Sequence, residues 1–301
     1  MDLRQLEAFV CTVELRSFTA AAQKLFLSQP TISSHVRALE KQLGTQLIRR
    51  TSKEFVVTPE GEQLYKYALG ILRMREHAKN ELSGRYSSDL LIGVSTTPAH
   101  SFLPIALRSY LDISPDAHFV IQQSESLDII EKIRLRNLEI GFVGMKKEDC
   151  LCTYVPLLLD ELVIAAPNTE HYRQMKARNA SSRELLREPM ILRSQFSALE
   201  KEAEAYIASI GLSLDDLHIV AHMNDAQLVA RCVAQGVGIA FISKSAVEDD
   251  VKKKDTILFA LSTPPLERTL YMVYRDDEFL SRSARQFVRT LTKQYALSDQ
   301  S

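Results

Sequence analysis

The 301-residue sequence lacks the features that mark several large classes of protein. No apolar run approaches the roughly 18 residues that a membrane span requires, and the opening MDLRQLEAF has no apolar signal-peptide core. Four cysteines are too few for a secreted disulfide framework in a chain of this length. No GxGxxG, Walker-type loop, HExxH or GxSxG motif occurs. We therefore expect a cytoplasmic protein that is not an enzyme, has no cofactor and does not contact a membrane.

Charge is distributed unevenly along the chain, although the net charge is only −1. Residues 1–87 hold 13 basic and 9 acidic side chains, whereas residues 88–301 hold 24 and 29. Within residues 16–54, seven basic side chains stand against two acidic ones. A basic head on a mildly acidic body is typical of a DNA-binding domain attached to a sensing domain.

Residues 17–43 predict two short amphipathic helices joined by a tight connection, which is a helix-turn-helix. Ser17 is a suitable N-cap for the first helix and Ser28 for the second, and Pro30 falls in a first turn, where no backbone donor is lost. Apolar residues recur at helical spacing on both helices. The stripe of the first helix is Phe18, Ala21, Ala22 and Leu25, and the core-facing stripe of the second is Ile32, Val36, Leu39 and Leu43.

Polar side chains occupy the opposite face and the N-terminal tip of the second helix. Hydroxyls, amides and cations of this kind suit base edges in the major groove and the adjacent phosphates. After this helix, residues 47–58 predict a two-stranded wing with cations at its tip, which can hold a phosphate or enter a minor groove. A three-helix bundle with a polar surface is the alternative, and the local positive charge argues against it. The predicted DNA contacts are Ser28, Gln29, Pro30, Thr31, Ser33, Ser34, Arg37, Arg50 and Lys53.

These residues resemble the LysR-type transcriptional regulators. The resemblance covers the whole chain, but its specific positions lie in the first sixty-odd residues. One departure is Ile48, where the family usually has Phe. The matching positions are Leu6, Phe9, Ser17, Phe18, Ala21, Ala22, Leu25, Ser28, Gln29, Pro30, Ser33, Leu39, Glu40, Leu43, Gly44, Leu47, Arg50, Thr58 and Gly61.

The resemblance implies an N-terminal winged helix-turn-helix, a long linker helix and a C-terminal two-lobed α/β effector domain built like a periplasmic binding protein. It also implies a double-stranded DNA operator, a small-molecule effector and a dimer or tetramer, with RNA polymerase as a further candidate partner. The stretches MDLRQLEAF and TPEGEQLYKYA are similar to those of members tied to sulfur or selenium metabolism.

A long helix from Pro59 to about Leu82 is predicted to connect the two parts, with Thr58 as its cap. Its near-heptad apolar seam favours pairing with the same helix of a second chain. The alternative is that the helix packs against the rest of its own chain. The seam is Leu64, Tyr67, Ala68, Ile71, Met74, Ala78 and Leu82. The predicted domains are 1–58 for DNA binding, 59–87 for the linker and hinge, and 88–301 for effector binding.

Short apolar strands alternate with helices after residue 88, which predicts a parallel-rich α/β sheet. We expect lobe I at about 88–166 and 263–301, and lobe II at about 167–262. Strands are predicted at 90–94, 119–121, 138–143, 161–166, 190–192, 219–221, 238–242 and 270–274. Ligands of such folds bind in the cleft at the carboxyl ends of the strands.

Polar residues at strand ends are the candidate effector contacts. Those at 95–97 match a turn that commonly contacts the effector in the resembling family, and a plain helix cap is the alternative. Arg193 could neutralise an anion or pair with an acid at the hinge. A small anionic metabolite is therefore the expected effector. The candidate set is Ser95, Thr96, Thr97, Gln123, Arg193, Ser194 and Asn224.

Two rival functions remain open at this point. Cys150 and Cys152 could form a thiol redox or soft-metal pair, but residues two apart in a strand point to opposite faces. His218 and His222 more often pack or face solvent than bind metal, so no metal site is expected. A free-standing solute-binding protein would have a signal peptide and no use for the first 60 residues.

Overall fold

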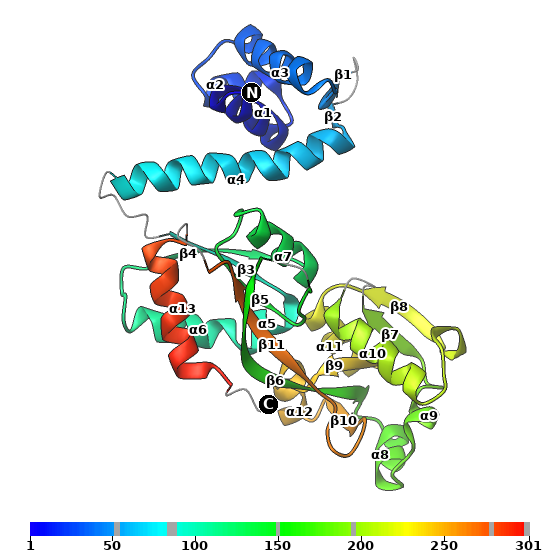
Figure 1. Cartoon of the computed structure of the whole chain (residues 1–301). Helices are drawn as coiled ribbons and strands as arrows, with labels where there is room; N and C mark the ends of the chain where they lie inside the picture. The colour runs from blue at the N-terminus through cyan, green and yellow to red at the C-terminus, as the bar shows by residue number, and fades with distance from the viewer. Residues whose placement is uncertain (51–54, 83–88, 149–150, 194–196, 277–279, 298–301) are drawn as a thin grey trace. The chain divides into compact units, whose positions relative to one another are not determined.

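The computed structural model describes residues 1–50, 55–82, 89–148, 151–193, 197–276 and 280–297 (Figure 1). The chain divides into two compact units, Met1–Ser87 with Arg134–Asn137, and Ser88–Ile133 with Leu138–Ser301. No helix within the described ranges is both long and apolar enough to cross a membrane.

The N-terminal unit is a winged helix-turn-helix that continues into one long helix. Its elements are α1 (Leu3–Leu15), α2 (Phe18–Lys24), α3 (Gln29–Leu43), β1 (Ile48–Arg50), β2 (Phe55–Val57) and α4 (Pro59–Leu82). As predicted, the Ser17 and Ser28 side chains cap α2 and α3 by accepting backbone N–H groups of their first turns. Ile32, Val36 and Leu39 are completely buried. Leu43 was expected in the core but is 43% exposed, because α3 ends there, just before the left-handed Gly44.

The wing is anchored to α3 by one carboxylate. Glu40 Oε1 accepts hydrogen bonds from the backbone N–H groups of Leu47 at 2.9 Å and Ile48 at 3.2 Å. Strands β1 and β2 then pair antiparallel, so the predicted wing strands are confirmed. The wing tip, residues 51–54, lies outside the described residues.

Helix α4 begins at the predicted position and uses its apolar seam in two ways. The Thr58 hydroxyl donates to Gln46 O at 2.7 Å and accepts from Gly61 N at 3.0 Å, which fixes the helix start. Ala68 is buried in the core of the DNA-binding helices, with Leu64 packed beside it. The alternative of packing on its own body therefore holds for this part of the seam. Farther along the seam, Met74 is 36% exposed and Leu82 90% exposed.

The C-terminal unit is built on a mixed nine-stranded sheet in the order β4-β3-β5-β11-β6-β9-β7-β8, with β10 paired to β6. Its strands are β3 (Asp89–Val94), β4 (His118–Gln123), β5 (Ile140–Val143), β6 (Thr153–Pro167), β7 (Met190–Arg193), β8 (Ile219–Met223), β9 (Ile239–Ser243), β10 (Thr256–Ala260) and β11 (Glu267–Tyr274). Its helices are α5 (Thr96–Ser101), α6 (Leu103–Leu111), α7 (Ser126–Arg134), α8 (Glu170–Ala177), α9 (Ser182–Leu185), α10 (Ala198–Ser209), α11 (Ala226–Ala234), α12 (Glu248–Lys252) and α13 (Arg282–Tyr295), with 3-10 turns at Leu214–Asp216 and Lys244–Val247.

Two long antiparallel strands join the lobes. The first half of β6 pairs with β11 in lobe I, and its second half pairs with β9 and β10 in lobe II. Strands β6 and β11 run side by side from one lobe to the other (Figure 1). The sequence predicted only residues 161–166 of β6 and missed β10. Parallel pairing is confined to β3 with β4 and β5, and to β7 with β8 and β9.

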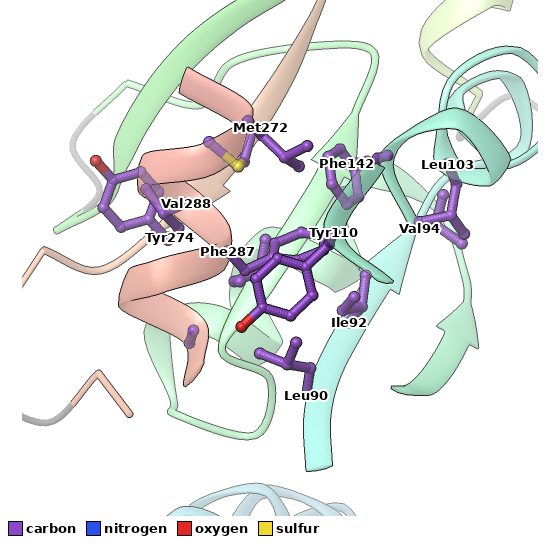
Figure 2. Close-up of a cluster of buried hydrophobic side chains, with 14 of the residues drawn as sticks. Leu90, Ile92, Val94, Leu103, Tyr110, Phe142, Met272, Tyr274, Phe287 and Val288 are labelled. Carbon is purple, nitrogen blue, oxygen red and sulfur yellow. The ribbon is translucent and has the colours of Figure 1, made fainter. Parts of the chain in front are cut away.

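Each lobe has a helix layer on both faces of its sheet, which explains its continuous apolar strands. In lobe I, Leu90 and Ile92 point toward α6 and α13 (Figure 2). There Tyr110 and Phe287 pack edge to face, with their ring centroids 4.9 Å apart. Leu91, between Leu90 and Ile92 in sequence, packs on the other face with α7.

Candidate DNA-binding face and effector pocket

Five of the nine predicted DNA contacts line one shallow groove along α3. The groove is lined by Gln29, Pro30, Ser33, Ser34, Arg37, Ala38 and Lys41. Arg37 and Lys41 are exposed, and no ion pair neutralises either of them within the described part of the chain. This face consequently carries unopposed positive charge beside short polar side chains, a combination that suits a groove wall of phosphates and base edges.

The remaining predicted DNA contacts are placed differently. Ser28 Oγ and Thr31 Oγ1 lie 2.8 Å apart, and the Ser28 hydroxyl accepts from Thr31 N at 3.3 Å. The Ser28 side chain therefore caps the N-terminus of α3, and the Thr31 hydroxyl is hydrogen-bonded to it. Ser33 lines the groove but is only 8% exposed. The backbone of Arg50 ends β1, and Lys53 lies outside the described residues.

A pocket between the two lobes gathers four of the seven predicted effector residues. Ser95, Thr96 and Thr97 approach it from the end of β3, and Arg193 from the end of β7. Gln123 and Asn224 are exposed and do not line this pocket, because their strands end beside it with these side chains turned to solvent. Ser194 lies outside the described residues.

The sequence analysis missed a second buried arginine at this pocket. Arg268 on β11 is 7% exposed, and its Nε donates to Asp160 Oδ2 on β6 at 2.9 Å. Asp160 also accepts from the Ser243 hydroxyl on β9. Strand register explains the pairing, since Arg268 lies directly opposite Asp160 in the antiparallel ladder. Only the weak signal of an arginine entering an apolar strand marked it in the sequence.

Each arginine also reaches a threonine of the 95–97 turn. Arg268 Nη2 donates to Thr97 Oγ1 at 2.8 Å, and Arg193 Nη2 donates to Thr96 Oγ1 at 3.3 Å. Because both threonine oxygens act as acceptors here, their hydroxyl hydrogens remain available. Neither hydroxyl donates a hydrogen bond to any other described residue. The bond from Arg193 to Thr96 therefore joins β7 of lobe II to the 95–97 turn of lobe I across the pocket.

Arg193 is buried and incompletely satisfied. It is 6% exposed, and its Nε atom has no hydrogen-bond partner among the described residues. Burial lowers the pKa of Arg193, an effect opposed by the carboxylates of Glu125, Asp225 and Glu200. A guanidinium still keeps its charge at neutral pH. The pocket therefore contains a desolvated cation with an unused donor.

Helix ends add to the positive potential. The first residues of α7, α10 and α11 (Ser126, Ala198 and Ala226) line the pocket, and unpaired N–H groups at helix N-termini favour anions. The Ser197 side chain at the α10 cap makes no capping hydrogen bond. The cavity inside the pocket is small, about 20 Å³, which is close to the room of one water molecule.

The structure describes only part of the cysteine pair. Cys150 lies outside the described residues, and Cys152 is half-buried. No group of three or more potential metal ligands occurs within the described ranges. Redox sensing therefore stays an untested prediction.

Comparison with known proteins gives the family. Residues 3–62 match "Bacterial regulatory helix-turn-helix protein, lysR family", and residues 83–296 match "LysR substrate binding domain". The transcriptional regulator CysL of Bacillus subtilis is 26% identical over 293 residues, covering 96% of both chains. Full-length CbnR complexed with its target DNA superposes with a TM-score of 0.68 at 18% identity, covering 97% of this chain and 99% of that one. A full-length OxyR variant from Pseudomonas aeruginosa has a TM-score of 0.70 at 18% identity, covering 97% and 94%.

These matches account for both units in the order in which the chain presents them. The helix-turn-helix excludes a free-standing solute-binding protein, and the family consists of regulators and not of enzymes. The chain belongs to the LysR family of DNA-binding transcriptional regulators, with a helix-turn-helix domain followed by an effector-binding domain.

Proposed function

We propose that this LysR-type regulator is controlled by a small anion bound between the two lobes of its C-terminal unit. The observation that carries the proposal is Arg193, which is 6% exposed, lines the pocket and leaves Nε without a partner among the described residues. An unmet buried donor costs roughly 1–3 kcal/mol, and more on a charged group. An anionic oxygen would satisfy it through a strong charge-assisted hydrogen bond.

Because the pocket is small, anion binding should be coupled to a movement of the two lobes. An anion of several atoms does not fit the room of about one water, so binding requires the lobes to separate about the β6 and β11 strands. The ligand then favours the more open arrangement by its differential affinity. The bonds from Arg193 to Thr96 and from Arg268 to Thr97 are the contacts that an entering anion would replace or share.

On the DNA side, we propose that Gln29, Pro30, Ser33, Ser34 and Arg37 enter the major groove. Ser28 and Thr31 lie at the N-terminal tip of α3, next to a phosphate, and the wing residues Arg50 and Lys53 hold the backbone or a minor groove. The groove along α3 and its unpaired cations support this arrangement, as does the likeness in fold to CbnR, a protein whose structure is known with its target DNA.

The protein is further proposed to act in the cytoplasm as a dimer or tetramer. Tyr67, Met74 and Leu82 leave apolar surface exposed on α4, and a second copy of the helix would cover it. The two DNA-binding domains of such a dimer then require two DNA half-sites related by a two-fold axis. The domain limits proposed are 1–58, 59–87 and 88–301. RNA polymerase is a candidate partner, and a role in sulfur or selenium metabolism is part of the proposal.

Footprinting tests this proposal directly. Purified protein is placed on the DNA upstream of its own gene at fixed salt, with and without a panel of inorganic oxyanions and small carboxylates. We expect a two-fold protected pattern that one anion shortens or shifts. Arg193→Gln should keep the protection but lose the anion response, whereas Arg187→Gln, which removes an exposed cation of lobe II, should keep both. An unchanged anion response in Arg193→Gln would refute the assigned pocket.

A second variant tests the DNA face. Arg37→Ala should weaken operator binding by about 1–3 kcal/mol, or roughly fivefold to a hundredfold. Arg4→Ala removes an exposed cation of α1 outside the groove and serves as the matched control. Equal affinities of both variants at the same salt concentration would contradict the assignment of α3 as the reading helix.

A further inference from the structure

The charged side chains around the pocket should favour some anions over others. Four carboxylates lie near the two arginines, and three of them are already bound. Asp160 accepts from Arg268, Glu200 accepts from the Arg193 backbone N–H at 2.9 Å, and Asp225 accepts from Leu228 N at 2.7 Å. None of these three carboxylates is among the described residues that line the pocket.

Glu125 is different from these three. It lines the pocket from lobe I, at the start of α7, and it is half-buried. Its carboxylate forms no hydrogen bond or ion pair with any described residue. Burial raises its pKa, and the field of Arg193 opposes that rise. The two side chains therefore face the same cavity without touching, one with an unused acceptor and the other with an unused donor.

We propose that Glu125 makes this site selective for a small anion that also carries a hydrogen-bond donor, and against an anion that can only accept. This inference rests on the proposed anion site. The anionic oxygens would bind Arg193 and the free hydroxyls of Thr96 and Thr97. The donor of the same ligand would bind the Glu125 carboxylate, so that one molecule spans both lobes.

The physical basis is the cost of an unmatched buried carboxylate. An acceptor-only anion placed between Arg193 and Glu125 leaves the carboxylate without a donor and sets like charges against each other. A hydrogen bond to a charged group that is made with one ligand and missing with the other discriminates between them by tenfold or more. A monohydrogen oxyanion and an α-amino acid zwitterion share the required chemistry, with a hydroxyl and an ammonium group as donor respectively.

The test compares matched anions by calorimetry on the full-length protein in mildly alkaline buffer. Hydrogen phosphate and sulfate are then tetrahedral dianions of similar size, and only phosphate carries a hydrogen. Glycine represents the zwitterion. We expect phosphate, glycine or both to bind at least tenfold more tightly than sulfate. Glu125→Gln, whose amide can donate, should reduce that preference to threefold or less and strengthen sulfate binding.

The control is Asp116→Asn, which removes one exposed carboxylate of lobe I outside the pocket and should leave the preference unchanged. A wild-type protein that binds sulfate as tightly as both other probes, or a preference that survives Glu125→Gln, would overturn the selectivity but leave the anion site standing. Absence of binding by all three probes would overturn the selectivity and the anion site together.

Discussion

Breaking the buried ion pair between Asp160 and Arg268 should destabilise the C-terminal unit far more than breaking an exposed pair of the same geometry. Asp160 and Arg268 are 3% and 7% exposed, and their charged atoms are 2.9 Å apart. Asp160→Asn keeps the shape of the side chain but leaves a guanidinium buried without its counter-charge. Removal of one partner from a buried pair costs about 3–5 kcal/mol.

Thermal denaturation of the full-length protein measures this loss. At roughly 2–4 °C per kcal/mol for a domain of this size, the thermal midpoint of the C-terminal unit should fall by about 10 °C. The matched control is Glu170→Gln. It breaks the bridge from Arg173 to Glu170, which is also 2.9 Å long but is exposed on both sides, and it should leave the midpoint unchanged because solvent screens such pairs.

A double-mutant cycle separates the pair from its surroundings. Arg268→Met should also destabilise the unit, because among the described residues it leaves Asp160 with the Ser243 hydroxyl alone. The double variant should be more stable than the sum of the two losses predicts, by at least about 1 kcal/mol. Strict additivity of the two substitutions, or a loss in Asp160→Asn no larger than that in Glu170→Gln, would refute the reasoning.

Three further outcomes are expected. Burial raises the pKa of Glu200 to about 7, so the folded state holds a proton that the unfolded chain releases above about pH 4.5. Stability should therefore fall as pH rises from about 4.5 to 7, and Glu200→Gln should abolish that slope in pH-dependent denaturation. Gly61→Ala should unfold the DNA-binding unit at lower temperature, because a Cβ there would lie 2.2 Å from Leu47 O. Serine at Cys152 should leave the peroxide response of operator binding unchanged, and an altered response would revive the redox hypothesis.

Local signals predicted the N-terminal unit well. Ser17, Ser28 and Thr58 fill the caps that their positions in the sequence indicated. The error at Leu43 came from extending the apolar stripe through a turn where no neighbouring helix remains. The seam of α4 could not be divided from sequence, because residues that pack on the same chain and residues that remain exposed share one spacing.

In the C-terminal unit, local sequence signals located the strand ends but not all of the side chains that line the pocket. Strand ends are visible in the sequence, so the 95–97 turn and Arg193 were found. Gln123 and Asn224 also follow strands, yet they are exposed, because a strand end fixes the position of a side chain along the sheet but not the direction in which the cleft lies.

The sequence by itself determined the family, the helix-turn-helix with its caps and polar face, and the alternation of strands and helices in the C-terminal unit. These properties depend on residues within a few positions of each other. Only the tertiary structure decided that Arg268 pairs with Asp160 and that Glu125 has no hydrogen-bond partner among the described residues. Asp160 and Arg268 are 108 positions apart and meet only through the register of β6 and β11, and the environment of a charge depends on everything that the fold packs around it.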